Sequence, residues 1–315
     1  MSSKQDFSPE SLPWLDRHVA EIDAYVSQID SKQTKYDLRE KLLHWLRFGY
    51  VIFEDAIERS LIDSFTKNID VILSGQSDSA VRLQIEGYGV NEARSLPQEA
   101  FSVNHLRIMD LHNLSVAGKM MSLHNIATDF LGHIFRDTVV AMQSLTFVHS
   151  TEQHSHQDFP YVVSGIPSHL AASWIALEDV HPEAGPLFYY PGSHMVNKFD
   201  WGNGLFLTPD STHNELDFAK FLEQKCLDAG LKRETFCPKK GDILFWHAGL
   251  VHGGSQAIKP QMTRKSYVTH YSTKTAYPRD RRAPEVEPIY FEINRGLLYE
   301  DPLNPSEESR FTFNS

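Results

Sequence analysis

The sequence predicts a mainly β protein, built as an antiparallel sandwich or jelly roll with helices packed on its outside. From Thr138 onward, short apolar runs alternate with turns, as in all-β folds. Before that point, apolar residues recur mainly at helical spacing. The expected strands cover residues 138–149, 170–180, 186–190, 242–247 and 264–272, and the turns between them fall at 182–185, 191–192, 240–241 and 253–254.

The N-terminal part is expected to support this β core. Residues 1–35 are polar and predicted to be irregular or loosely helical. Asp37, with Glu40 three positions later, has the spacing of a helix N-cap, and Gly49 ends that helix. A strand at 50–53 and a helix over 57–73 follow.

Residues 74–104 are polar and rich in turn formers, which predicts either a lid over a site or a plain surface loop. A strand is expected at 106–111. Ser115 is then the expected N-cap of one helix, whose apolar stripe is predicted to be core packing. The stripe consists of Val116, Met120, Leu123, Ala127, Phe130 and Ile134.

One helix interrupts the β region. Thr212 and Glu215 have capping-box spacing, and Gly230 is the expected end. Its predicted buried stripe is Leu216, Ala219, Leu222 and Cys226. The whole chain, 1–315, is interpreted as one domain. Residues 1–137 form its mostly helical support, 138–275 its β core, and 276–315 an extension that could wrap the core or cover a site.

Composition excludes several classes. The formal net charge of −11 over 315 residues argues against nucleic acid or an anionic membrane as partner. The N-terminus has neither a basic start nor an apolar run, and no stretch is apolar enough to span a bilayer. A cytoplasmic protein with two reduced cysteines and a small-molecule substrate is therefore expected. Its oligomeric state is left open.

The most informative pattern is His156-Gln157-Asp158 followed much later by His252. Residues two apart on a strand point to the same side, so the imidazole and the carboxylate can face one metal. A second imidazole completes a 2-His-1-carboxylate facial triad, which suits non-haem Fe(II) and O₂ chemistry. His154 would replace His156 if the register differed, and spacing alone hardly separates His252 from His247 as the second imidazole.

Arg264 is expected to begin the last strand, with Ser266 on the same face. A buried guanidinium beside a hydroxyl is suited to binding a carboxylate, because arginine makes paired charge-assisted hydrogen bonds. An exposed arginine following a turn is the alternative interpretation.

These residues occur in an order that resembles one enzyme family. His156-Gln-Asp158 is followed by Ala172-Ser-Trp174-Ile-Ala-Leu-Glu-Asp179, by Gly185-Pro-Leu-Phe-Tyr-Tyr-Pro-Gly-Ser-His194, by Gly241-Asp-Ile-Leu-Phe, and then by His252 and Arg264. Together they resemble the phytanoyl-CoA dioxygenase family of Fe(II)/2-oxoglutarate-dependent oxygenases. The resemblance covers most of residues 38–275.

The resemblance implies a double-stranded β-helix (jelly roll, cupin-like) with iron held by His156, Asp158 and His252. It implies that Arg264 binds the distal carboxylate of 2-oxoglutarate and that Trp174 flanks this cosubstrate. Ser266 or Ser255 would add a hydroxyl contact. A lysine that helps hold the cosubstrate in the family has no clear counterpart here, and Gln143 or Thr146 is the expected substitute.

The implied function is a dioxygenase that uses Fe(II), 2-oxoglutarate and O₂, with ascorbate as a helper. It would hydroxylate or otherwise oxidise a C–H bond of a small metabolite and release succinate and CO₂. Because Asp158 is present, oxidation is expected rather than the chlorination of relatives that lack this carboxylate. The alternatives are a cupin enzyme that uses a metal without 2-oxoglutarate, and a barrel that binds without catalysis.

Overall fold

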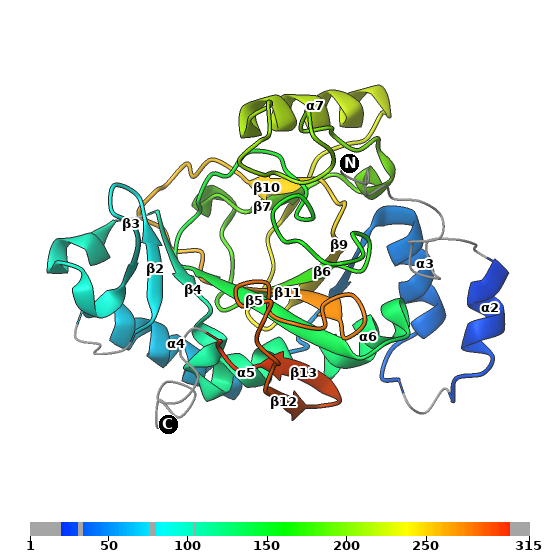
Figure 1. The fold of residues 1–315 in the computed structure, drawn as a ribbon, viewed down its shortest axis with the longest axis horizontal. Coiled ribbons are helices and arrows are strands. Elements are labelled where there is room, and N and C mark those ends of the chain that lie inside the picture. The colour runs from blue at the N-terminus through cyan, green and yellow to red at the C-terminus, as the bar shows by residue number, and fades with distance from the viewer. Residues whose placement is uncertain (1–19, 31–33, 76–79, 104, 303–315) are drawn as a thin grey trace.

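The computed structural model describes residues 20–30, 34–75, 80–103 and 105–302. Within these residues the fold is a two-sheet β core covered by helices (Figure 1), which confirms the predicted jelly-roll architecture. The helices are α2 Ala20–Val26, α3 Leu38–Phe48, α4 Arg59–Leu73, α5 Val116–Ser122, α6 Asn125–Phe135 and α7 Glu215–Asp228, with short 3₁₀ turns at Ala93–Ser95, Gln98–Ser102, Leu111–Asn113, Pro182–Ala184 and Ser193–Met195.

In the part of the chain that the structure describes, ten strands form the larger sheet. Its main path runs β1-β9-β6-β11-β5-β4-β2-β3. The ranges along this path are Tyr50–Phe53, Ile243–His247, Ala171–Ala176, Ser266–Thr273, Val139–Phe147, Leu106–Met109, Arg82–Ile85 and Gly89–Glu92. Off this path, β12 (Tyr290–Ile293) pairs with β13 (Gly296–Tyr299), which in turn lies parallel to β5. The smaller sheet is β10-β7-β8, with ranges His252–Gly254, Leu187–Tyr189 and Glu234–Phe236.

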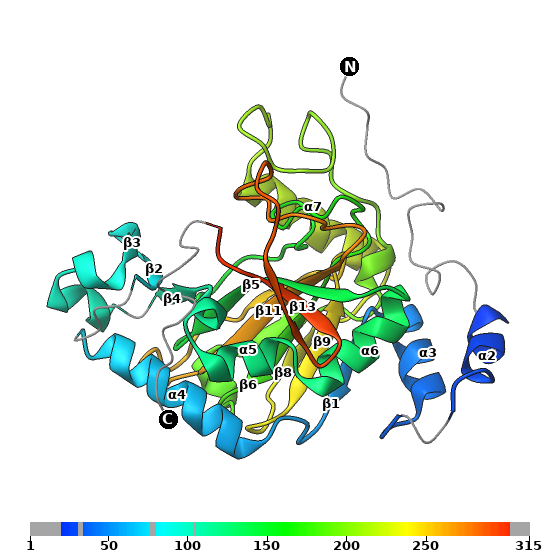
Figure 2. The ribbon, with the colours of Figure 1, turned by 60° about the horizontal axis from the view of Figure 1, so that its bottom comes forward.

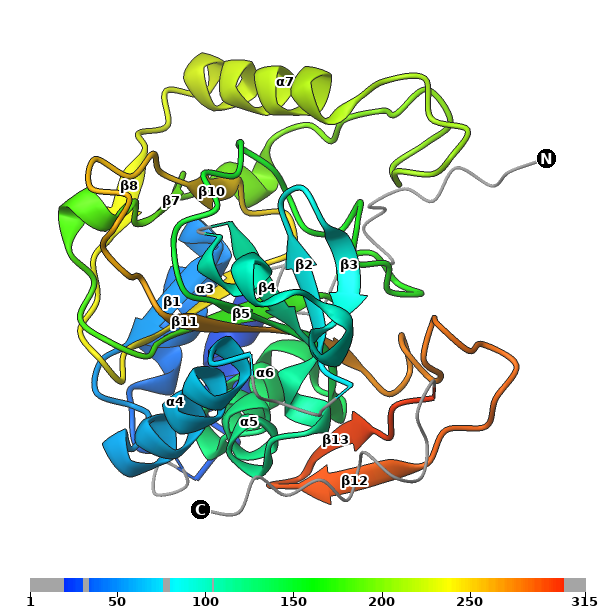
Figure 3. The ribbon, with the colours of Figure 1, turned by 90° about the vertical axis from the view of Figure 1, so that its left-hand side faces the viewer.

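The two sheets enclose the interior in which the predicted site residues lie. Viewed from the side, α4, α5 and α6 cover the outer face of the larger sheet, while the smaller sheet and α7 lie on the opposite side (Figure 3). The helices pack through an aromatic cluster in which Phe130 of α6 contacts Trp45, Phe53 and Phe245, with ring centroids 5.8, 5.3 and 5.6 Å away. Burial of these large apolar rings is the main force holding the helical layer to the sheet.

The first predicted helix is confirmed in detail. Asp37 is its N-cap and accepts a hydrogen bond from the backbone N–H of Glu40. Gly49 follows the last turn with φ +76°, a conformation that glycine adopts without the steric cost other residues pay. The strand after it, β1, pairs with β9 and so ties the N-terminal region to the β core.

Three predictions in the N-terminal half were wrong. Residues 74–104 are not one loop, since β2 and β3 form a hairpin that pairs with β4. The single helix expected after Ser115 is two helices, separated at Leu123 and His124, because His124 caps the second one. Because the two helices do not share one apolar face, Val116 and Met120 of the predicted stripe are exposed, while its other members are buried.

The helix inside the β region, α7, begins two residues later than predicted. Asn214, rather than Thr212, is its N-cap, and Asp217 completes the capping box. Leu216 is exposed, whereas Ala219, Leu222 and Cys226 are buried as expected. Gly230, just beyond the helix, has a positive φ.

The C-terminal extension wraps the core. The β12–β13 hairpin lies beside β5 and next to α5 and α6 (Figure 2). Residues 1–19 of the predicted irregular N-terminus, and 303–315 of the extension, lie outside the described residues. That the whole chain is one domain stays a prediction.

Candidate active site

The three predicted metal ligands converge. One ligand atom each from His156, Asp158 and His252 lies within 4.8 Å of the other two, and all three residues are buried. Oδ1 of Asp158 is 3.7 Å from Nε2 of His156 and 3.6 Å from Nε2 of His252. A search of the described residues for three or more His, Cys, Asp or Glu side chains that could hold a metal ion finds this group alone.

Backbone pairing brings the two histidines together. His156 and His252 form an isolated antiparallel bridge in which each backbone N–H donates to the carbonyl of the other, at 2.9 and 3.0 Å. His252 begins β10, but His156 and Asp158 lie in a loop and not on the strand that the sequence predicted. The two side chains still share a direction, because the chain is locally extended at the bridge.

Hydrogen bonds prepare both imidazoles for a metal. Nδ1 of His156 contacts the carbonyl of His154, and Nδ1 of His252 contacts the carbonyl of Leu250, both at 2.9 Å. A carbonyl only accepts, so each Nδ1 carries the proton and each Nε2 presents a lone pair towards Asp158. The donor set, two neutral imidazoles and one carboxylate, therefore fits a divalent metal of the Fe(II) type.

Electrostatics favour the metal-binding protonation states. Burial, together with the neighbouring His252, lowers the pKa of His156 to about 3. Burial alone would raise the pKa of Asp158, but the imidazoles of His252, His270 and His156 outweigh it and hold the pKa below its ordinary value. Neutral histidine and ionised carboxylate are the forms that bind cations.

The alternative histidines do not join this group. His154 is exposed and offers its backbone carbonyl to His156. His247 lies in β9, where its Nδ1 accepts from the backbone N–H of Gly249 and its ring packs against Trp45. The structure thus brings His252, and not His247, to the triad.

A cavity of about 250 Å³ opens beside the triad and collects most of the other predicted residues. Arg264, Trp174 and Gln143 line it, together with residues that the sequence did not single out. These are Arg107, Leu145, Phe147, Thr151, Gln153, Tyr161, Val162, Leu187, Glu215, Trp246, Gly253, Gly254, Val268 and His270. Thr146, the alternative to Gln143, does not line this cavity.

Arg264 is buried and lines this cavity. It lies just before β11 rather than within it, and its backbone N–H donates to the carbonyl of Val148 at 2.7 Å. The side chain is 3% exposed, with Cζ 5.7 Å from the ring centroid of Trp174. Burial lowers its pKa to about 10, so the guanidinium remains charged at neutral pH.

Nε of Arg264 and Oγ of Ser266, two residues before and at the start of β11, are buried and have no hydrogen-bond partner among the described residues. Unpaired buried polar atoms are costly and rare, and at a site they indicate that a ligand completes them. A carboxylate bound in the cavity would satisfy Nε of Arg264, whereas Ser266 is fully buried and is not among the residues that line the cavity. Ser255, the other hydroxyl considered, already accepts from Nη2 of Arg233 at 2.9 Å.

Sequence reasoning missed three residues with defined roles in the geometry. Nε1 of Trp246 donates to Oδ2 of Asp158 at 2.7 Å. Nε2 of His270 lies 3.5 Å from the same oxygen. Arg107 on β4 brings a second guanidinium into the cavity, 5.8 Å from the centroid of Phe147. Strand alternation could have found His270, which shares a face with Ser266.

Comparison with known proteins agrees with this geometry. Fold and site together define a jelly-roll oxygenase of the iron- and 2-oxoglutarate-dependent class. The model of the phytanoyl-CoA dioxygenase family matches residues 45–266, and the chain belongs to this family. Comparison with curated protein sequences gives no match.

Solved structures share the fold at low identity. The carbocyclase SnoK from nogalamycin biosynthesis is 18% identical, with a TM-score of 0.56 over 74% of this chain and 83% of SnoK. The epimerase SnoN, in complex with Fe³⁺, α-ketoglutarate and nogalamycin RO, is 17% identical, with a TM-score of 0.56 over 84% of this chain and 98% of SnoN. EctD from S. alaskensis with bound Fe is 19% identical, with a TM-score of 0.55 over 79% of this chain and 80% of EctD.

None of the helices in the described part of the chain is long and apolar enough to cross a membrane.

Proposed function

We propose that this protein is an Fe(II)- and 2-oxoglutarate-dependent dioxygenase that hydroxylates or otherwise oxidises a C–H bond of a small metabolite, with release of succinate and CO₂. The observation that carries the proposal is the convergence of three buried metal-ligand side chains, His156, Asp158 and His252, beside a buried arginine with an unpaired Nε. Family membership supports the same class.

Each part of the cavity has a place in this proposal. The triad would hold Fe(II), which supplies the O₂-activating chemistry when bound. Arg264 would bind the distal carboxylate of 2-oxoglutarate, with Ser266 donating a further hydrogen bond and Trp174 flanking the chain. Gln143 lines the same cavity, and its contact with the cosubstrate stays a prediction.

The protein's own contribution is to position these groups and to exclude water. Phe147, Leu145 and Val268 form an apolar wall around the polar groups. A low-dielectric wall strengthens the attraction between Arg264 and a carboxylate. The small cavity favours a small metabolite, and the negative overall charge mildly disfavours a polyanionic acyl-CoA.

The same fold occurs in enzymes that carry out different types of reaction. Structures with this fold include a carbocyclase and an epimerase as well as EctD. Hydroxylation or a related oxidation, rather than chlorination, is proposed because Asp158 occupies the metal position that chloride would need. A cytoplasmic location is proposed on the composition alone.

The test is a panel of small metabolites incubated with the protein, Fe(II), 2-oxoglutarate, O₂ and ascorbate. Succinate formation that depends on both Fe(II) and a panel compound supports the proposal. Iron-dependent turnover of a compound without consumption of 2-oxoglutarate would favour a cupin enzyme that needs no cosubstrate. Failure to bind Fe(II) in an anaerobic titration would favour a non-catalytic barrel.

A further inference from the structure

A short C-terminal segment, Tyr277–Arg282, contacts two residues that line the candidate active site, although it lies beyond the residues that the family model matches. Nη2 of Arg281 donates to Oε1 of Gln143 at 2.9 Å, and Nη1 donates to the carbonyl of Tyr161 at 2.8 Å. The backbone N–H of Arg281 donates to the hydroxyl of Tyr277 at 3.0 Å. Both the guanidinium and the backbone of Arg281 are therefore held in place.

The contact with Arg281 fixes the direction of a hydrogen-bond chain. A guanidinium only donates, so the oxygen of the Gln143 amide must face Arg281. The amide nitrogen then faces His270 and donates to its Nδ1 at 3.2 Å. Because Nδ1 accepts, the proton of the His270 ring is on Nε2. The Nε2 atom lies 3.5 Å from Oδ2 of Asp158.

The chain ends on the oxygen of Asp158 that faces away from the triad imidazoles. Oδ2 accepts from Nε1 of Trp246 at 2.7 Å and lies next to the N–H of His270. Oδ1 is the carboxylate oxygen that lies near Nε2 of His156 and of His252. The indole on β9 and the imidazole on β11 thus approach Oδ2 from two elements, which limits rotation of the carboxylate about its last torsion.

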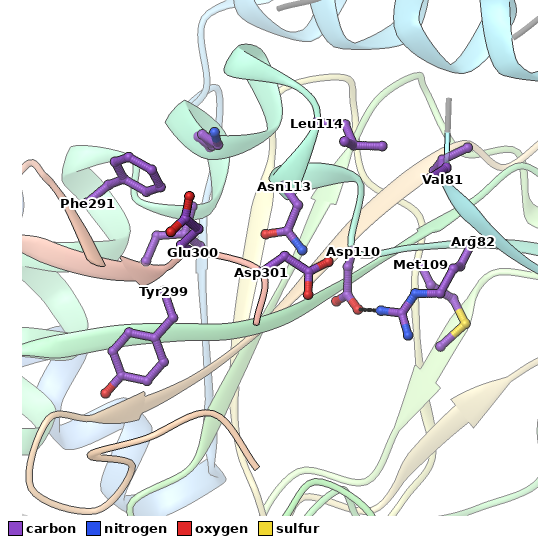
Figure 4. Close-up of a pocket in the computed structure, with 13 residues that line it drawn as sticks. Val81, Arg82, Met109, Asp110, Asn113, Leu114, Phe291, Tyr299, Glu300 and Asp301 are labelled. Atoms are coloured by element: carbon purple, nitrogen blue, oxygen red, sulfur yellow. Dashed lines mark hydrogen bonds and ion pairs between the residues drawn. The ribbon is translucent and has the colours of Figure 1, made fainter. Parts of the chain in front are cut away.

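The next residue anchors the segment. The guanidinium of Arg282 forms ion pairs with Asp280 at 2.8 Å, with Asp301 at 3.2 Å and with Asp110 at 3.6 Å. Asp110 also pairs with Arg82 at 2.6 Å, and Figure 4 shows Asp110 between Arg82 and Asp301. A network of partly buried charges holds its members more firmly than an isolated surface pair. Arg281 is thus held against Gln143 and Tyr161, while Arg282 is held by the acidic side chains of Asp280, Asp301 and Asp110.

Resting on the proposed function, we propose that Arg281, Gln143 and His270 are positioning residues that orient the carboxylate of Asp158 for the metal, so that the C-terminal segment is part of the active site. Partners that orient a metal ligand typically contribute about 10–100-fold to metal affinity. His270 lies next to the ligand and carries the larger share. Arg281 acts through two intermediates and carries the smaller.

The first experiment measures Fe(II) affinity by anaerobic titration. Arg281→Ala is compared with Arg279→Ala, since Arg279 is an exposed arginine in the same segment that pairs with Glu287 instead. We expect Arg281→Ala to weaken Fe(II) binding several-fold, up to about tenfold, and Arg279→Ala to leave it unchanged. His270→Leu should weaken binding by about 10–100-fold, and His270→Gln should recover part of this loss, because a glutamine amide both donates and accepts.

The second readout is independent of enzyme activity and of iron. In the protein loaded with diamagnetic Zn(II), ¹⁵N-resolved NMR of the histidine rings reports which nitrogen carries the proton. His270 should be protonated on Nε2 in the unmodified protein, and Gln143→Leu or Arg281→Ala should increase the Nδ1-protonated form. Thermal unfolding of each variant checks that it folds.

The outcomes separate the two proposals. Equal Fe(II) affinity in Arg281→Ala and Arg279→Ala, together with an unchanged His270 proton position, would overturn the positioning role while leaving the proposed function standing. An unmodified protein that does not bind Fe(II) would instead remove the proposed function itself. In that case, the proton position of His270 can still be measured by NMR in the metal-free protein. If it is the same in Gln143→Leu as in the unmodified protein, the proposed hydrogen-bond chain is rejected.

Discussion

His156 and His252 face each other across a single antiparallel β-bridge, with ring centroids 4.2 Å apart. The bridge joins a loop to the first residue of β10, far away in sequence, and it fixes the spacing of the two predicted metal ligands through the backbone. Asp158 then needs only to turn one carboxylate oxygen towards the pair. The site is consequently assembled by main-chain hydrogen bonds, and its side chains are oriented by their neighbours.

Removal of a triad member should abolish metal binding. We expect Asp158→Ala and His156→Ala each to lose high-affinity Fe(II) binding and metal-dependent succinate formation, because a facial triad has no spare protein ligand. Anaerobic titration with Fe(II) measures the first effect. His154→Ala is the matched control, since its side chain is exposed and its carbonyl remains to hold His156. Retained Fe(II) binding in Asp158→Ala would falsify the triad.

Substitution of Arg264 should act on the cosubstrate. Arg264→Leu removes a charge-assisted pair with a carboxylate, so the 2-oxoglutarate concentration for half-maximal binding should rise by roughly 10–100-fold. Fe(II) affinity without 2-oxoglutarate should change little. The free energy of unfolding of the ligand-free protein should not fall, because the buried guanidinium has an unpaired Nε there. An unchanged 2-oxoglutarate requirement would place the carboxylate elsewhere.

Trp246→Phe keeps an aromatic ring but removes the N–H that donates to Oδ2 of Asp158. We expect Fe(II) affinity to fall by about tenfold, with little change in 2-oxoglutarate affinity, because the indole acts on the metal ligand. Trp201→Phe is the control, since it removes an indole N–H from the cluster beneath α7. Equal affinities in the two variants would show that the indole only fills space.

His112 should make stability depend on pH. Burial lowers the pKa of His112 to about 4 from an ordinary value of 6.5, and Nδ1 contacts Oγ of Ser144 at 2.7 Å. Between these pH values the unfolded chain binds the extra proton and the folded protein does not. The contribution of His112 to the free energy of unfolding is therefore complete above pH 6.5. It decreases as pH falls from there towards pH 4, by roughly 1.4 kcal/mol per pH unit at most.

Urea unfolding at pH 7 and pH 5 checks this prediction. His112→Gln should reduce the loss of unfolding free energy between the two pH values, relative to the unmodified protein. His105→Gln, at an exposed histidine near Glu86, is the comparison and should leave the loss unchanged. An equal loss in His112→Gln and the unmodified protein would mean that other groups account for it.

The sequence by itself determined which residues could form the site and where most elements lie. The spacing of His156, Asp158, His252 and Arg264 is a property of the chain, and so are caps such as Asp37, which act within one helical turn. Local signals of this kind depend on neighbouring residues only. They can therefore be recognised without knowledge of the rest of the fold.

Spacing alone did not separate His247 from His252, although the family resemblance favoured His252, and only the tertiary structure decided what surrounds the triad. His247 and His252 differ in the element that each joins, β9 or β10, and strand pairing between distant segments sets that choice. The pairing of β2 with β4, and of β4 with β5, likewise joins segments that are distant in sequence. Contacts of Asp158 with Trp246 and His270 arise where separate strands meet, and no local pattern encodes such a meeting.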